Sequence, residues 1–224
     1  MLCKTSRSGC ATIDVEHGGT ILARYLGHGG SVTDFSVSRG DPQVFATSCS
    51  DGFARLFDSR TPLPVLTFDA CQNTECCYAV VLAHPDSIPT LFTATGVAQQ
   101  IKVWDIRART PVYELATGNN RVQSLAWDPT RNHLYAATEC SYQDWMGYRH
   151  DYEYTESGKR WTPESEDRRP KSWPENAWHL ENHFDYMFDA GDHRIYRYAY
   201  KEDPDVSVLP EYGDAQPGEC DDCW

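Results

Sequence analysis

Two stretches of the chain, residues 44–60 and 91–107, carry the same pattern 47 residues apart. Each begins with a strand-forming run that contains small residues, followed by a turn and by a second run in which apolar and polar residues alternate. This second run ends with an aromatic residue, then Asp, a variable residue and Arg. Self-similarity at a period in the forties is typical of folds in which one repeat cannot bury its faces alone and packs on its neighbours. This repeat constrains the fold more strongly than the composition of the chain does.

The same spacing extends toward the N-terminus. The pair at residues 13–14 precedes the aromatic-Asp pair at residues 57–58 by 44 residues, and Gly27-His28 lies about thirty residues before that second pair. A Gly-His pair followed at this distance by an aromatic residue and Asp is the signature of a WD repeat. On these residues the chain resembles the WD40-repeat family over most of residues 10–139. The resemblance implies a β-propeller built from four-stranded blades.

The register of the repeats predicts where the strands lie. The first whole blade is expected to have strands at 31–38, 43–49, 53–58 and 64–69, and the second at 78–83, 90–95, 100–106 and 111–116. The third is expected to start with strands at 121–128 and 132–139 and to resume, after roughly fifty inserted residues, at 192–200. The predicted fold class is all-β: a partial WD40-type β-propeller with three blades, the end of a preceding blade, and a long irregular insertion in the last blade.

These expectations divide the chain into four parts. Residues 1–139 hold the WD40 repeats, with blade ends near 26, 70 and 117, and residues 140–182 form an insertion rich in aromatic and charged residues. Residues 183–209 return to the last blade, and residues 210–224 form an acidic tail with cysteines. Because propellers close with roughly four to eight blades, we expect the chain to be the C-terminal part of a longer protein. The alternative is association with another chain that completes the ring.

The resemblance also implies which residues hold each blade together. In the family, a loop His, a strand Ser or Thr, a turn Asp and a Trp of the third strand form one hydrogen-bonded network. The residues matched to this structural role are His28, Thr47, Asp51, Asp58, Trp104 and Asp105. Phe57 stands where the family has a Trp in the first blade, so an indole N–H donor is lost there. We interpret His28 and Asp51 as structural rather than as a catalytic pair.

Two groups of residues are predicted to contact partners. Arg60 and Arg107 end the repeated pattern in consecutive blades, and an Arg fixed at a strand end offers a planar set of donors to a carboxylate. Their simpler interpretation is local pairing with the preceding Asp. The second group lies in the insertion, and it consists of Trp145, Trp161, Trp173 and Trp178. Tryptophan is enriched at interface hot spots, but these rings could instead fold back and cover an exposed blade.

Charge and cysteine content limit the kind of partner. The chain has 33 Asp and Glu against 20 Lys and Arg, a formal net charge of −13, which argues against nucleic acid and anionic membranes as partners. Nine cysteines, no secretory leader and no apolar run of membrane-spanning length predict an intracellular protein of the nucleus or cytoplasm. Cys220 and Cys223 have the spacing of zinc ligands, but a structural site needs four ligands, so no metal is predicted.

The sequence shows no set of nucleophile, base and orienting group, so we expect no catalytic residue, no cofactor and no enzymatic activity. It predicts a scaffold that binds other proteins or peptides within a larger complex. Two alternatives stay open. Paired aromatic-Asp-x-Arg endings mark, in a subset of WD40 proteins, the substrate receptors of a cullin-type ubiquitin ligase, and a hydrolase or metal enzyme on a propeller scaffold is the other.

Overall fold

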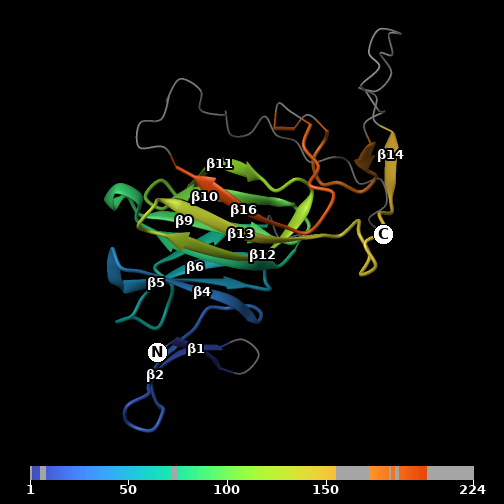
Figure 1. The fold of residues 1–224 in the computed structure, drawn as a ribbon. Coiled ribbons are helices and arrows are strands. Elements are labelled where there is room, and N and C mark those ends of the chain that lie inside the picture. The colour runs from blue at the N-terminus through green and yellow to red at the C-terminus, as the bar shows by residue number, and fades with distance from the viewer. Residues whose placement is uncertain are drawn as a thin grey trace, which may run out of the picture.

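The computed structural model describes residues 2–5, 9–71, 75–154, 172–181, 183–184 and 187–200. Within these ranges the regular structure is β-strand, apart from one short 3-10 turn, η1 (Pro85–Ser87). The strands build successive antiparallel sheets that stack side by side from the N-terminus toward the last sheet (Figure 1). The all-β fold class, with a partial propeller, is confirmed.

Each sheet is one blade or part of one. The N-terminal sheet has the order β1-β2-β3, with β1 (Leu2–Thr5), β2 (Gly9–Asp14) and β3 (Thr20–Tyr25). The first blade has the order β4-β5-β6-β7, with β4 (Val32–Ser38), β5 (Asp41–Cys49), β6 (Phe53–Asp58) and β7 (Leu66–Asp69). The second blade consists of β8 (Cys77–Ala83), β9 (Thr90–Thr95), β10 (Gln100–Asp105) and β11 (Thr110–Ala116).

The third blade is interrupted between its second and third strands. It has the order β12-β13-β16, with β12 (Asn120–Asp128), β13 (His133–Cys140) and β16 (Arg194–Ala199). β16 pairs antiparallel with β13, so the chain returns to the same sheet after the insertion. The insertion is less irregular than expected, because β14 (Tyr152–Tyr154) pairs antiparallel with β15 (Ser172–Pro174). These two strands flank residues 155–171 in the sequence.

The hairpin between β5 and β6 shows why the repeated segment folds as it does. Gly52 has φ of 85°, a left-handed conformation that Gly adopts without steric cost. Asp51 Oδ1 accepts the backbone N–H of Phe53 at 3.1 Å, which fixes the turn before β6 starts. The small residues of β5 are buried beside this turn and leave room for the neighbouring sheets.

The core lies between the blades rather than within one of them. β6 and β10 are buried along almost their whole length, because sheets cover both of their faces. In contrast, β16 alternates between exposed and half-buried residues, as expected for a sheet covered on one face only. The apolar layers join the N-terminal sheet to the first blade, the first blade to the second, and the second to the third.

The polar network of the first blade is divided into two pairs. His28 Nε2 lies 3.0 Å from Thr47 Oγ1, while the buried His28 Nδ1 has no hydrogen-bond partner. Asp51 pairs instead with the buried Arg55 of β6, whose two terminal nitrogens lie 3.0 and 2.7 Å from its carboxylate oxygens. Burial by itself would raise the pKa of Asp51, but hydrogen bonds from Arg55 and from the Gly29 backbone N–H hold it at about 2.

In the second blade, different residues form the polar contacts that hold the strands and the turn. Trp104 Nε1 donates to Thr93 Oγ1 at 2.8 Å, and both residues are buried. No Asp occupies the turn between β9 and β10. Glu75, which precedes β8, accepts the backbone N–H groups of Val97 and Ala98 in this turn, the latter at 2.8 Å. A carboxylate therefore caps the turn in both blades, from the turn itself in one and from the preceding loop in the other.

Substitution Asp51→Asn should destabilise the protein by about 3 kcal/mol at neutral pH, because the buried Arg55 would lose its charged partner. The pKa of Asp51 is lower in the folded protein than its ordinary value of 3.8, so its contribution is present above pH 4 and is lost as the pH falls toward 2. Urea unfolding of both proteins at several pH values checks this. Asp58→Asn, at an exposed ion pair, is the matched control and should cost much less.

Substitution Trp104→Phe should cost about 2 kcal/mol, because the Thr93 hydroxyl would lose its donor and the core would lose ring volume. A double-mutant cycle with Thr93→Val separates the two effects. If the hydrogen bond matters, Thr93→Val costs about 1 kcal/mol less in the Trp104→Phe background than in the original protein. Strict additivity of the urea unfolding free energies would contradict this account of the second blade.

Candidate interaction site

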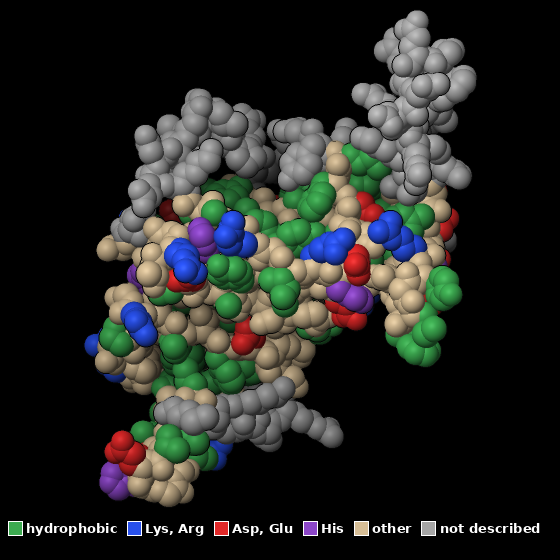
Figure 2. Space-filling view, viewed as in Figure 1, with side chains coloured by type: hydrophobic (Ala, Val, Ile, Leu, Met, Phe, Trp, Pro, Cys, Tyr) green, Lys and Arg blue, Asp and Glu red, His purple; other side chains and the backbone are tan. Residues whose placement is uncertain are grey.

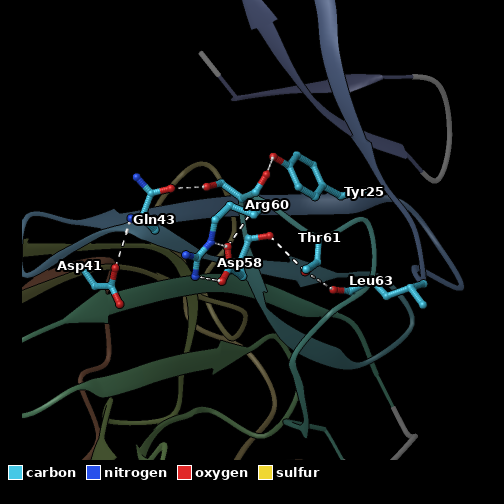
Figure 3. Close-up of polar contacts among 8 residues, drawn as sticks. Tyr25, Asp41, Gln43, Asp58, Arg60, Thr61 and Leu63 are labelled. Atoms are coloured by element: carbon cyan, nitrogen blue, oxygen red, sulfur yellow. Dashed lines mark hydrogen bonds and ion pairs between the residues drawn. The ribbon is translucent and has the colours of Figure 1, made fainter.

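Arg60 folds back onto the Asp of its own motif. Its Nε donates to Asp58 Oδ1 at 2.8 Å, and a terminal nitrogen donates to Asp58 Oδ2 (Figure 3). The Arg60 backbone N–H also donates to Asp58 Oδ1, at 2.9 Å. These contacts, the guanidinium first, lower the pKa of Asp58 to about 2. The charged carboxylate thus engages the same donors that a carboxylate of a partner would need.

Ser59, which lies between Asp58 and Arg60, is hydrogen-bonded to the N-terminal sheet and to the first blade. Tyr25, the last residue of β3, donates its hydroxyl to the Ser59 carbonyl at 3.1 Å. Ser59 Oγ donates to Gln43 Oε1 of β5 at 2.9 Å (Figure 3). The position of the Arg60 backbone is therefore set by the N-terminal sheet and the first blade together.

Arg107 occupies the equivalent position after β10 in the second blade. Its Nε lies 3.7 Å from Asp105 Oδ1, which also accepts the backbone N–H groups of Ala108 and Arg107 at 3.2 and 2.8 Å. These backbone N–H groups lower the pKa of Asp105. The side chains of Arg60 and Arg107 are 73% and 69% exposed. Both arginines reach solvent, and each is paired within its own motif.

A hairpin at the start of the insertion projects from the edge of the molecule. It lies in the connection between β13 and β14 (yellow in Figure 1), and hydrophobic side chains gather at this projection (Figure 2). Its tip carries Trp145, Met146 and Tyr148, whose exposed fractions are 92%, 59% and 70%. Three large apolar side chains in four residues are thus presented to solvent together.

The hairpin is held in shape by its first turn residue. Asp144 Oδ1 accepts the backbone N–H groups of Met146 at 2.8 Å and Tyr148 at 2.9 Å. The Asp144 backbone N–H donates to the Tyr148 carbonyl at 3.0 Å, and Gly147, with φ of 86°, donates its N–H to the Asp144 carbonyl at 3.0 Å. The exposed rings therefore stand on a turn that is held by four hydrogen bonds to Asp144.

The other tryptophans of the insertion lie differently. Trp173 and Trp178 are half-buried, and the Trp178 backbone N–H donates to Gln99 Oε1 of the second blade at 3.2 Å. Trp173 Nε1 donates to the His179 carbonyl at 3.3 Å. Trp161 falls outside the described residues. The Trp145 side chain is thus exposed, whereas Trp173 and Trp178 are half-buried, and the role of all three in partner binding stays a prediction.

The inner strands of the three blades border a hollow. β4, β8 and β12 line a cavity of about 1090 Å³, with Asp34 on its wall. Burial raises the pKa of Asp34, against hydrogen bonds from the Phe35 and Val80 N–H groups. Ser36 Oγ accepts the Leu82 N–H at 2.8 Å, so polar groups of this wall link neighbouring inner strands. Ser38 Oγ also lies 2.7 Å from His84 Nδ1 on the same wall, so polar contacts between neighbouring inner strands recur along the hollow.

The described residues contain neither a metal-binding cluster nor a membrane-spanning helix. No group of three or more His, Cys, Asp or Glu side chains there could hold a metal ion. Within the same ranges, no helix is long and apolar enough to cross a membrane. Cys220 and Cys223 fall outside the described residues.

Sequence reasoning did not single out several residues that matter in the structure. Met146 was absent from the predicted site, although the spacing of Asp144 and Gly147 around aromatic residues is a turn signal that could have located the hairpin. Glu75 could not be matched, because it caps its turn from another loop. The buried cations Arg55 and Lys102 were also missed, since both stand in strands at positions where an apolar residue would be expected.

Comparisons with known proteins agree with this architecture. The family model for the WD domain, G-beta repeat (WD40), matches residues 19–58, which run from the end of the loop before β3 to the end of β6. The Polycomb group protein FIE1 of Zea mays is 25% identical over 162 residues, covering 65% of this chain and 32% of the relative. The chain thus spans about a third of the length of this curated relative.

Solved structures show the same fold. A chain in the crystal structure of a mitotic checkpoint complex superposes with a TM-score of 0.52 at 21% sequence identity, over 60% of this chain and 42% of that one. The sheet order, the aromatic-Asp endings and the matched repeat point the same way. Residues 19–58 match the WD40 repeat, and the described part of the chain has the fold of a partial β-propeller of the WD40 type.

Proposed function

We propose that this protein is a non-enzymatic scaffold that binds another protein through the Trp145 hairpin. WD40 repeats are typical of scaffolds within protein complexes, and the two similar proteins are named for a Polycomb group and for a mitotic checkpoint complex. The observation that carries the proposal is a hairpin, held by hydrogen bonds to Asp144, that places three large apolar side chains in solvent. The proposal places the protein in intracellular assemblies of the nucleus or cytoplasm.

The hairpin has the properties of a binding element rather than of a mobile loop. Trp and Tyr supply large contact areas with few rotatable bonds, so ordering them on a partner costs little entropy. The Asp144 turn orders the backbone before binding. Because the tip protrudes, it fits a concave apolar site on the partner, in which the Trp145 ring would be the anchor.

The charges near the hairpin favour a protein over nucleic acid or an anionic bilayer. Segment 141–154 carries Asp144, Asp151 and Glu153 against Arg149, with His150 Nδ1 at 2.7 Å from Asp151. The whole chain carries a formal charge of −13. Phosphate groups would be repelled by this surface, whereas a protein pocket with basic residues at its rim would be attracted.

No observation favours the alternative of a ubiquitin-ligase substrate receptor. An adaptor carboxylate would have to displace Asp58 from Arg60, and Asp105 from the neighbourhood of Arg107. Neither similar protein is named for such a ligase. Arg60 and Arg107 remain contacts predicted from the sequence, and the hairpin proposal does not require either of them to bind the partner.

The triple change Trp145→Ala, Met146→Ala and Tyr148→Ala should remove the stoichiometric partner that co-purifies with the tagged protein from cells, because it deletes the apolar anchor. Quantitative mass spectrometry of parallel purifications measures the loss. Arg60→Ala with Arg107→Ala is the matched surface control and should retain that partner. If the arginine variant loses it and the hairpin variant keeps it, the hairpin proposal is wrong and the receptor alternative gains support.

Substitution Asp144→Ala should weaken partner binding by about tenfold while leaving every apolar side chain in place, because the turn would lose two hydrogen bonds that order it. Hydrogen exchange at the Met146 and Tyr148 amides should become faster, with no change in the melting temperature. Unchanged exchange at both amides would show that Asp144 does not organise the hairpin.

A further inference from the structure

Two histidines of the insertion stack on each other against the second blade. The rings of His179 and His183 have centroids 3.9 Å apart and an interplanar angle of 39°. His179 is 4% exposed, and neither of its ring nitrogens has a hydrogen-bond partner. Burial of this kind disfavours the charged imidazole, because the ring loses its hydration.

The groups that face the pair make a positive charge on His179 unfavourable. Lys102 of β10 is buried beside it and donates from Nζ to the Ala70 carbonyl at 3.1 Å. Glu114 of β11 is the carboxylate at the cluster, but its Oε2 lies 3.5 Å from His183 Nε2 rather than beside His179. Burial and then His183 lower the pKa of His179 to about 3, with a further contribution from Lys102, and hydrogen bonding to the Ala98 and Gln99 backbone acts in the opposite direction.

The same histidines lie in the segment that joins the insertion to the second blade. We call residues 172–181 with His183 and Phe184 the docked segment. Its polar anchors centre on Gln99, whose Oε1 accepts the Trp178 N–H at 3.2 Å and whose Nε2 donates to the Tyr142 hydroxyl at 2.9 Å. Tyr142 in turn donates its hydroxyl to the Asn176 carbonyl at 2.9 Å. These bonds anchor the segment that carries His179 and His183.

We propose that the stacked His179–His183 pair is a pH-sensitive switch that holds the docked segment on the second blade at neutral pH and releases it in acid. A free segment would expose His179 to water, where its pKa has the ordinary value of 6.5. The docked form therefore binds fewer protons than the free form. Docking is fully stable above pH 6.5 and weakens as the pH falls below it, by about 30-fold between pH 7.5 and 5.0.

Release would change the surface that the insertion presents. Trp173 and Trp178 are half-buried while the segment is docked, and they would reach solvent when it leaves. Tyr142 also accepts the His150 N–H on its carbonyl at 3.0 Å, so the base of the Trp145 hairpin is connected to the same contacts. The switch itself does not depend on what the hairpin binds, since it rests on the histidine pair and its neighbours.

Hydrogen exchange followed by mass spectrometry on the full chain tests the switch. Protection factors, corrected for intrinsic exchange rates, are measured from pH 7.5 to 5.0 for the peptide that contains the Trp178 amide. We expect protection there to fall by about 30-fold, while β8–β10 keep their protection. Equal losses in both regions would mean global unfolding and would overturn the proposal, as would unchanged protection of the docked segment.

Two variants assign the effect to the buried ring. His179→Phe keeps an aromatic ring that cannot be protonated, so protection of the docked segment should become independent of pH over this range. His150→Gln, at an exposed histidine of the same insertion, is the matched control and should respond as the original protein does. If His179→Phe responds to acid like the original protein, His179 is not the sensor. If that variant does not fold, the pH series of the original protein still decides between release and no release.

Discussion

Face-to-face packing of sheets is the interaction on which the rest of this structure depends. A blade of this protein is apolar on both faces, so it is stable only where a neighbouring sheet covers each face. The first and second blades meet this condition, and their third strands β6 and β10 are buried almost throughout. β3 and β16, in the outer sheets, keep exposed positions such as Leu22 and Ile195. The burial of each strand follows from its place in the stack.

Close packing on both faces explains why the polar networks differ between blades. A strand buried on both sides has no solvent for a polar side chain, so Arg55 requires Asp51, and Lys102 requires the Ala70 carbonyl. The Asp51 carboxylate is paired with Arg55 and makes no hydrogen bond to His28, so His28 Nδ1 has no partner. Where Trp104 supplies an indole donor, Thr93 is satisfied directly. The hydrogen-bond partners that the family network would have therefore differ between the two blades, and the buried side chains of each blade determine which bonds form.

The fold could be predicted from the sequence because short local patterns indicate the order of the strands and the period of the repeat. The strands of the first two blades lie within a few residues of the predicted ranges, since turns such as Asp51-Gly52 set the register. Contacts between distant segments had no such local signal. Glu75 reaching the turn before β10, and Trp178 docking on Gln99, depend on the path of loops with no periodicity. Composition alone could not tell exposed Trp145 from half-buried Trp173.

The contrast between these tryptophans follows from what the neighbouring backbone requires. Around residue 145, the Asp144 turn satisfies the hairpin internally, so nothing draws the Trp145 ring toward the propeller. Around residue 178, the Trp178 N–H and the Asn176 carbonyl are satisfied by Gln99 and Tyr142, and this holds the segment against the second blade. Within the insertion, the Trp145 hairpin therefore projects into solvent, and the docked segment packs on the second blade. Among the described residues of the insertion, the docked part carries the buried His179 ring in contact with His183, and this gives that part a physical reason to respond to acid.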